Sequence, residues 1–446
     1  MSSIKTIAIK GTIWTLIAYG GNQTLRLVSN IILTRLLVPE LFGLMALVNT
    51  FIYGLNLFSD IGIRPSIIRS SRGDDPKFLN TAWTLQVIRG IGLWLACCTI
   101  AWPVAKFYQD SQFIWLLPVV GLTTMISGFN STSLATLNRK MEISKLTKFE
   151  VSLKVLSLTI TIIWAYFQKS IFALIAGNLV SSLITMIGSH RLDSTVSNRF
   201  AWDHESLKEI TSFGRWIFVS TAMTFLANQS DRLIMGKLLS LELLGVYTIA
   251  LTFAFLPRQV LGAISGKIIL PLISQHQNLP REELRKKILK KRWFLLMGLA
   301  GIITILFVGG DLIILTLYDV RYHDAAWMLT ILGIGLWPML LHMSINQTLF
   351  AIGKPSYLAI GSSIKVLCMF IFIPIGHSLL GTLGAIIVVA LNDIPSYISV
   401  NYGLWKEGFL TIKQDFQATI FLIGLISTCM MLRYLLGYGL PLSQIM

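Results

Sequence analysis

The sequence predicts an all-α polytopic membrane protein, because its composition and its hydrophobic runs agree. Apolar residues make up 54% of the 446 residues and charged residues only 13%, whereas soluble domains use about 25% charged residues. The mean hydropathy is +0.70. Apolar runs of about 20 residues recur along the chain and match the thickness of a bilayer, in which only closed hydrogen-bonded structures can exist. A water-soluble fold could not bury this much apolar surface.

Thirteen apolar runs are long enough to span a membrane as helices. The first run begins near Gly11, lacks a small-residue cleavage site and is followed at once by a second run. We therefore expect a retained membrane span and not a signal peptide. The predicted spans are residues 11–33, 42–64, 81–105, 114–136, 149–167, 171–190, 214–236, 243–268, 293–318, 326–350, 357–376, 379–402 and 417–437.

The basic residues predict the orientation of these spans. With a cytoplasmic N-terminus, the inner loops and their borders hold 24 Lys and Arg residues, and the outer loops hold 5. Cytoplasmic loops are the ones that collect Lys and Arg, so the net charge of +16 needs no nucleic-acid partner. The basic run 281–292 is expected to form a cytoplasmic helix that touches membrane lipid headgroups.

An internal repeat predicts two similar halves. A shift of 202 residues lays residues 34–51 over residues 236–253. SLKVL at 152–156 also recurs as SIKVL at 363–367. Six spans return the chain to its starting side, so the two repeats are parallel and related by an axis along the membrane normal. The identities are Leu36, Leu37, Glu40, Leu41, Gly43, Thr50 and Phe51 with Leu238, Leu239, Glu242, Leu243, Gly245, Thr252 and Phe253.

The expected architecture is therefore two six-helix lobes around a central cavity, plus one C-terminal transmembrane helix. The domains are an N-terminal lobe (1–192), a cytoplasmic linker (193–213), a C-terminal lobe (214–404), and a cytoplasmic loop with the extra helix (405–446). Rocking of such lobes opens the cavity to one face at a time. Transport by alternating access is the expected output.

Three segments, residues 33–68, 228–247 and 349–357, carry a family resemblance. The pattern R-L-L-x-P-E-x-F-G at 35–43 is followed by F-S-D-I-G at 58–62, and NQSDRLIMGKLLSLELLGVY occupies 228–247. LFAIGKPSY at 349–357 adds a short turn after the tenth span. Together they resemble the polysaccharide-export, Wzx-type flippases of the multidrug/oligosaccharidyl-lipid/polysaccharide superfamily. Twelve or fourteen spans are common in that family, so the last span could be one helix or part of a truncated pair.

The resemblance implies a flippase of the bacterial inner membrane. It would carry an undecaprenyl-diphosphate-linked oligosaccharide from the cytoplasmic to the periplasmic leaflet, for lipopolysaccharide, O-antigen or exopolysaccharide synthesis. No cofactor and no covalent chemistry are implied. Polysaccharide assembly proteins are expected partners.

Cations within the spans are the candidates for contact with the diphosphate. The charges of such a headgroup would lose their hydration in hydrocarbon, so the carrier must supply partners. Arg26 lies well inside the first span, and Arg258 lies near the centre of the eighth beside Pro257. A guanidinium suits phosphate because it binds two oxygens and does not deprotonate. The further candidates are Lys154, Lys365, Arg89 and Arg232.

These further cations also fit roles without substrate. Arg89, Lys154 and Lys365 lie close enough to the cytoplasmic ends of their spans to reach lipid headgroups. Arg232 follows Asp231 near the periplasmic end, where a charge cluster would stabilise the lobe.

Three acidic residues are candidates for coupling to H⁺ or Na⁺. Asp393 lies near the middle of the twelfth span, and Asp231 lies toward the outer end of the seventh. A buried carboxylate can take up and release a proton as its surroundings change. For Asp393, pairing with a neighbouring Lys or with the carbonyls before Pro395 is an equal alternative. Asp60, beside Gly62, fits a structural contact at the cytoplasmic mouth.

Other functions fit the sequence less well. A polysaccharide polymerase or ligase needs a large periplasmic loop, and the predicted outer loops have about three to nine residues. No nucleotide or metal motif appears, and the four cysteines lie in apolar runs. A cation-drug exporter would favour intramembrane acids, whereas this chain has more bases. A lipid II exporter stays open because its cargo shares the diphosphate, and an assembly scaffold would tolerate loss of the buried charges.

Overall fold

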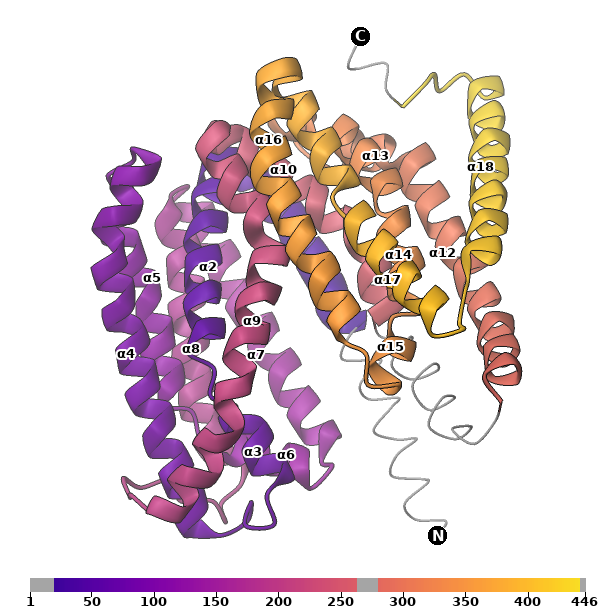
Figure 1. The fold of residues 1–446 in the computed structure, drawn as a ribbon. Helices are drawn as coiled ribbons and strands as arrows, with labels where there is room; N and C mark the ends of the chain where they lie inside the picture. The colour runs from indigo at the N-terminus through magenta and orange to yellow at the C-terminus, as the bar shows by residue number, and fades with distance from the viewer. Residues whose placement is uncertain (1–19, 263–279, 442–446) are drawn as a thin grey trace. The chain divides into compact units, whose positions relative to one another are not determined.

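Every regular element in the described part of the chain is a helix, as the all-α prediction required. The computed structural model describes residues 20–262 and 280–441 (Figure 1). The chain forms two compact units, Met1–Phe225 and Leu226–Met446. The boundary between them falls inside helix α9 (His204–Leu238).

The first unit consists of long apolar helices and two short ones. A helix over residues 20–36 precedes them. α4 packs on α5, α7 packs on α8, and α5 also contacts α2 and α8. The elements are α2 (Pro39–Phe58), α3 (Ile63–Arg69), α4 (Pro76–Tyr108), α5 (Gln112–Gly128), α6 (Ser133–Arg139), α7 (Ile143–Phe167) and α8 (Ile171–Leu192).

The second unit repeats this packing order. α12 packs on α13, α16 packs on α17, and α13 also contacts α10 and α16. α2 and α10 begin at Pro39 and Leu241, 202 residues apart, as the sequence repeat predicts. The elements are α10 (Leu241–Ala254), α12 (Arg281–Leu317), the 3₁₀ turn η1 (Val320–Tyr322), α13 (Ala325–Gly335), α14 (Trp337–Met343), α15 (Gln347–Ala351), α16 (Ser356–Leu391), α17 (Ile394–Lys406) and α18 (Ile412–Leu435).

Fewer spans are counted in the structure than in the sequence, for identifiable reasons. Within the described residues, 8 helical segments are long and apolar enough to cross a membrane, or up to 10 with two bent pairs. One segment, Ser356–Lys406, contains two predicted spans, because two helices meet at a sharp kink with non-helical backbone at Leu380 and Gly381 and are counted as one segment. α9 covers the seventh predicted span but is not among these segments. The first half of the first predicted span lies outside the described residues.

The middle of the predicted linker (193–213) packs against α4. The backbone amides of Arg199 and Asp203 donate to Asn80 Oδ1 and Thr81 Oγ1, at 3.0 and 3.1 Å. The Ser206 hydroxyl and amide donate to the Asp203 carboxylate and hold the pKa of that carboxyl below its usual range. A capping carboxylate of this kind satisfies the free amides at the start of α9.

Two buried ion pairs join the last helix, α18, to α12 (Figure 1). Arg292 Nη1 lies 2.6 Å from Asp415 Oδ1, and Arg433 Nη2 lies 2.6 Å from Asp311 Oδ2. Because the partners occur in the same order along both helices, the two helices run parallel. At 1.5 Å per residue the pairs are roughly 28 Å apart, close to the thickness of the hydrocarbon core. The first pair lies just before the predicted spans 293–318 and 417–437, and the second lies toward their far ends.

Removing one partner of a buried ion pair is expected to destabilise the protein more than replacing both partners with apolar residues. Asp311→Leu or Arg433→Met alone leaves a buried charge without its partner, which costs about 3–5 kcal/mol. The double variant Asp311→Leu/Arg433→Met leaves no such charge and should recover most of the loss. Melting temperatures in detergent measure the effect. Arg281→Ala is the control, because its side chain is 65% exposed in its pair with Glu407. A double variant no more stable than the single variants would contradict the expectation.

Candidate functional site

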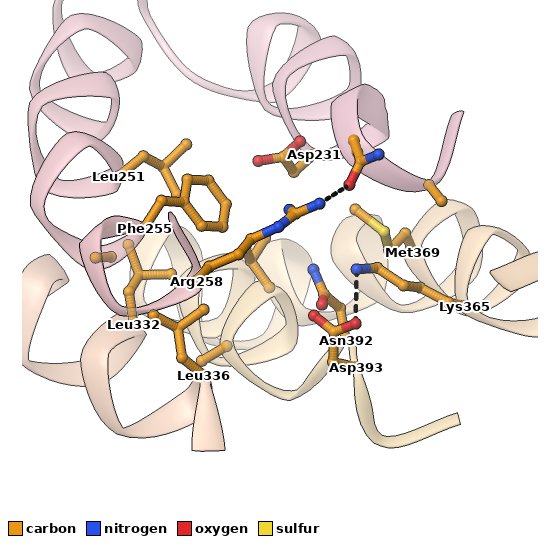
Figure 2. A pocket seen from close by; sticks show the side chains of 15 residues that line it. Asp231, Leu251, Phe255, Arg258, Leu332, Leu336, Lys365, Met369, Asn392 and Asp393 are labelled. Carbon is orange, nitrogen blue, oxygen red and sulfur yellow. Dashed lines mark hydrogen bonds and ion pairs between the residues drawn. The ribbon is translucent and has the colours of Figure 1, made fainter. Parts of the chain in front are cut away.

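A small polar pocket in the second unit brings together four of the predicted residues (Figure 2). Arg258, Asp231, Lys365 and Asp393 line a cavity of about 30 Å³. This volume is enough for a water molecule or a small cation, since one water needs roughly 10–15 Å³ on the same scale. The four charges come from α9, α16, the residue before α17 and the helical turn after α10.

A helix break positions Arg258. α10 ends at Ala254, and the turn Leu256–Gly262 is bent by 40° relative to it. Pro257 lacks an amide hydrogen, which is a common cause of such a bend. Arg258 Nη2 donates to Asn228 Oδ1 at 2.7 Å, and the guanidinium lies 5.6 Å from the centre of the Phe255 ring. Within the described residues both contacts are to uncharged groups, and Arg258 forms no direct ion pair there.

Lys365 and Asp393 form a buried ion pair. Lys365 Nζ donates to Asp393 Oδ1 at 2.9 Å, and His342 Nε2 lies 3.5 Å from the same oxygen. Figure 2 shows the Lys365 ammonium directed at Asp393. Asp393 precedes the first turn of α17, where the helix dipole favours a negative charge. The carboxylate is thus held by the protein's own cation.

Asp231 has fewer partners among the described residues than Asp393, the other carboxylate of the pocket. Its Oδ2 accepts a hydrogen bond of 2.6 Å from the Tyr247 hydroxyl. Its Oδ1 is buried and has no hydrogen-bond partner in the described part of the chain. A buried acceptor without a partner is costly, so Oδ1 is the pocket atom best suited to a proton or a small cation. Arg232, the next residue, donates to Gln229 Oε1 at 2.7 Å and is not among the residues that line the pocket.

Arg89 and Asp60 stabilise the corner after α2 in the first unit. Arg89 Nε donates to the Ser59 carbonyl at 2.9 Å, and its Nη2 donates to the Asn56 carbonyl at 2.7 Å. These carbonyls belong to the end of α2, where helical donors are lacking. Asp60 Oδ1 accepts from the Gly62 amide at 2.8 Å, and Gly62 has a φ of +70°. Arg89 also lines a cavity of about 220 Å³ within this unit.

Arg26 and Lys154 lie close enough in the first unit for their charges to interact. Arg26 is half-buried on the helix over residues 20–36, and Lys154 is exposed on α7. Two cations near each other favour a bound anion. Lys154 and Lys365 hold equivalent repeat positions, yet of the two only Lys365 is buried in an ion pair.

Arg292 is a fully buried cation that lies outside the set of predicted site residues. The basic run 281–292 is expected to be a cytoplasmic helix, but in the structure it continues without a break into the apolar part of α12. Leu284, Ile288, Arg292 and Leu296 are all buried at four-residue spacing. That spacing is the signal that places Arg292 on the packed face of the helix. Arg292 Nε also donates to Ser344 Oγ at 2.7 Å.

The equivalent lysines provide a test of the ion pair in the pocket. Lys365→Met is expected to cost about 3–5 kcal/mol, because Asp393 would stay buried without its cation. Lys154→Met removes the same charge from an exposed site and should change stability by about 0.5 kcal/mol or less. Thermal unfolding of the purified variants in detergent measures both. Equal melting temperatures for the two variants would contradict the structural role of Lys365.

Sequence comparison matches this chain to a known family and to individual polysaccharide biosynthesis proteins. A family described as "Polysaccharide biosynthesis protein" matches residues 32–327. The lipopolysaccharide biosynthesis protein WzxC of Escherichia coli (strain K12) is 23% identical over 411 residues, or 89% of this chain and 81% of that protein. The succinoglycan biosynthesis transport protein ExoT of Rhizobium meliloti (strain 1021) is 23% identical over 266 residues, or 59% of this chain and 53% of ExoT.

Solved transporters share the fold. The lipid II flippase MurJ, in an inward closed conformation, superimposes with a TM-score of 0.72 at 14% identity, over 94% of this chain and 92% of MurJ. An inward-facing multidrug resistance MATE transporter gives a TM-score of 0.64 at 16% identity, over 91% of this chain and 96% of the transporter. At these identities the likeness concerns the fold alone.

Proposed function

This chain belongs to the polysaccharide biosynthesis protein family, and from that premise we propose that it carries an undecaprenyl-diphosphate-linked oligosaccharide across the bacterial inner membrane. The direction is from the cytoplasmic to the periplasmic leaflet, with the N-terminus in the cytoplasm. The family membership agrees with the Wzx-type resemblance of the sequence motifs. The proposed work is transport without covalent chemistry.

The observation that carries this proposal is that Arg258 forms no direct ion pair among the described residues. Its guanidinium is half-buried in an apolar helical unit, and its contacts among the described residues are to Asn228 and to the Phe255 ring. A cation held in this way costs folding free energy, and an anionic ligand would offset that cost. A diphosphate offers the oxygens that a guanidinium binds best. Arg26 and Lys154 are the candidate cations of the first unit.

Ion coupling is proposed to act through Asp231. Its Oδ1, unpartnered among the described residues, belongs to a pocket of about 30 Å³ in which Asp393 is already neutralised by Lys365. A proton or Na⁺ at Asp231 would change the charge of the pocket that also contains Arg258. Occupation of this site would then alter how strongly Arg258 holds an anion.

Lipid II is the second candidate cargo. The fold is similar to that of MurJ with a TM-score of 0.72, and both cargoes would present a diphosphate to the same cations. Growth of a strain depleted of its lipid II flippase, with this chain expressed, distinguishes the two. Rescue of growth would favour lipid II. Failure to rescue, together with restored surface polysaccharide in a strain lacking this protein, would favour the oligosaccharide.

The role of the two arginines can be tested by complementation. Arg26→Ala and Arg258→Ala should each lower surface polysaccharide about tenfold or more in a strain lacking the protein, because a hydrogen bond to a charged group contributes about 1.5–3 kcal/mol. Arg258→Lys should retain part of the activity, since it keeps the charge but not the fork. Lys169→Ala, at an exposed loop position, is the control. Full restoration by both alanine variants at normal membrane levels would overturn the assignment.

Asp231→Asn tests the coupling site. The amide oxygen can still accept from Tyr247, so the fold is expected to survive while the charge is lost. Transport in membrane vesicles should then become insensitive to the gradient that drives the unaltered protein. Glu150→Gln, at an exposed position on α7, should leave that sensitivity unchanged. A variant that still responds to the gradient would remove Asp231 from the coupling mechanism.

A further inference from the structure

A basic groove lies between the N-terminal parts of α12 and α18 in the second unit. Its volume is about 610 Å³, and it opens to the outside of the unit. Arg285, Lys290 and Lys413 line it together with Trp293 and Phe294. The groove is separate from the pocket around Arg258, and one of its two walls, α18, follows the second set of six spans.

The cations of the groove are uncompensated. No acidic side chain is among the residues that line it. Across the described ranges 20–262 and 280–441, Arg285, Lys290 and Lys413 have no hydrogen bond or ion pair to a protein group. Arg285 Nε is nevertheless buried. By contrast, Arg281, one turn earlier on α12, is paired with Glu407. Three unpaired cations around one groove repel each other unless an anion lies between them.

The groove is preformed, because its two walls are tied together. Gln414 Nε2 donates to the Leu289 carbonyl of α12 at 2.7 Å, and Gln414 Oε1 accepts from Arg292 Nη1 at 3.0 Å. Arg292 is also paired with Asp415, the next residue of α18. A ligand therefore meets cations that are already in place, which lowers the entropy lost on binding.

The position of the groove identifies the source of the anion. The Arg292–Asp415 pair lies just before the predicted spans 293–318 and 417–437, at the level expected for one membrane surface, and the second pair lies roughly 28 Å farther along the helices. Trp293 lies at the same level, where aromatic side chains prefer the interface. From there an apolar stripe runs along α18 through Phe416, Ile420 and Ile423, which are 66%, 54% and 58% exposed. Cations at the headgroup level above an apolar stripe fit a phosphate with acyl chains attached.

We propose that this groove binds the phosphate of an anionic phospholipid, in the leaflet that is cytoplasmic in the proposed topology. Arg285 and the two lysines contact the phosphate, while the acyl chains lie along the exposed stripe of α18. A zwitterionic lipid would bring its own cation into a groove that already has three, so the site selects net negative headgroups. The binding needs no particular cargo and stands apart from the transport function.

Matched charge variants test the site in the full-length protein. The groove variant is Arg285→Gln/Lys290→Gln/Lys413→Gln. The control variant, Lys286→Gln/Lys287→Gln/Lys291→Gln, removes the same charge from exposed residues of α12 that do not line the groove. Native mass spectrometry in detergent counts bound phosphatidylglycerol and phosphatidylcholine. A second conservative variant, Arg285→Lys/Lys290→Arg/Lys413→Arg, keeps the charge and should bind as the unaltered protein does.

Phosphatidylglycerol should bind at least fivefold more weakly to the groove variant than to the unaltered protein, and as strongly to the control variant as to the unaltered protein. Phosphatidylcholine should bind weakly to all of them. Inorganic phosphate at millimolar concentration should not displace the lipid, because it lacks the acyl chains. Displacement would identify the groove as a site for free phosphate and would overturn the lipid assignment. Equal losses in the groove and control variants, or equal binding of both lipids, would also overturn it.

Discussion

An ionised side chain in hydrocarbon has no water to hydrate it, and this constraint governs every charged group within the spans of this protein. The structure meets it in three ways. Two pairs of opposite charges neutralise each other between α12 and α18. Arg89 is surrounded by carbonyls at the end of α2. Among the described residues Arg258 has one hydrogen bond, to Asn228, and a ring contact, so it keeps more donors open to a ligand than Arg89 does.

The same constraint supports the proposal that the pocket of the second unit serves in ion coupling. In this conformation its volume of about 30 Å³ has room for a water molecule or a small cation, so contact between Arg258 and a diphosphate requires the pocket to open, as alternating access provides. Two carboxylates and two cations within that space respond strongly to one added charge, because electrostatic interactions are strengthened where water is scarce. Lys365 in this arrangement acts as a built-in counter-ion for Asp393, which supports the proposal that Asp231 is the residue that exchanges a proton or Na⁺.

Much of the fold could be predicted from the sequence, because lipid imposes length and polarity on each span. The structure confirms the repeat offset of 202 residues at the starts of α2 and α10. Side-chain pairing could not be predicted in the same way, because whether Lys365 faces Asp393 or a cavity depends on helix rotation and packing. Arg292 shows a further limit. Its basic run suggests a solvated helix, but Ile288, one turn earlier, is only 2% exposed. A charged residue in register with such a neighbour packs against the protein.

The two ion pairs between α12 and α18 affect the order in which the chain can assemble in the membrane. α12 enters the membrane with Arg292 and Asp311 well before α18 has left the ribosome, so for that interval both charges lack their native partners. Completion of the second unit therefore waits for the C-terminal helix. A chain that stops before Thr411 would keep all twelve predicted spans of the repeat, yet it would leave one unmatched charge of each sign on α12.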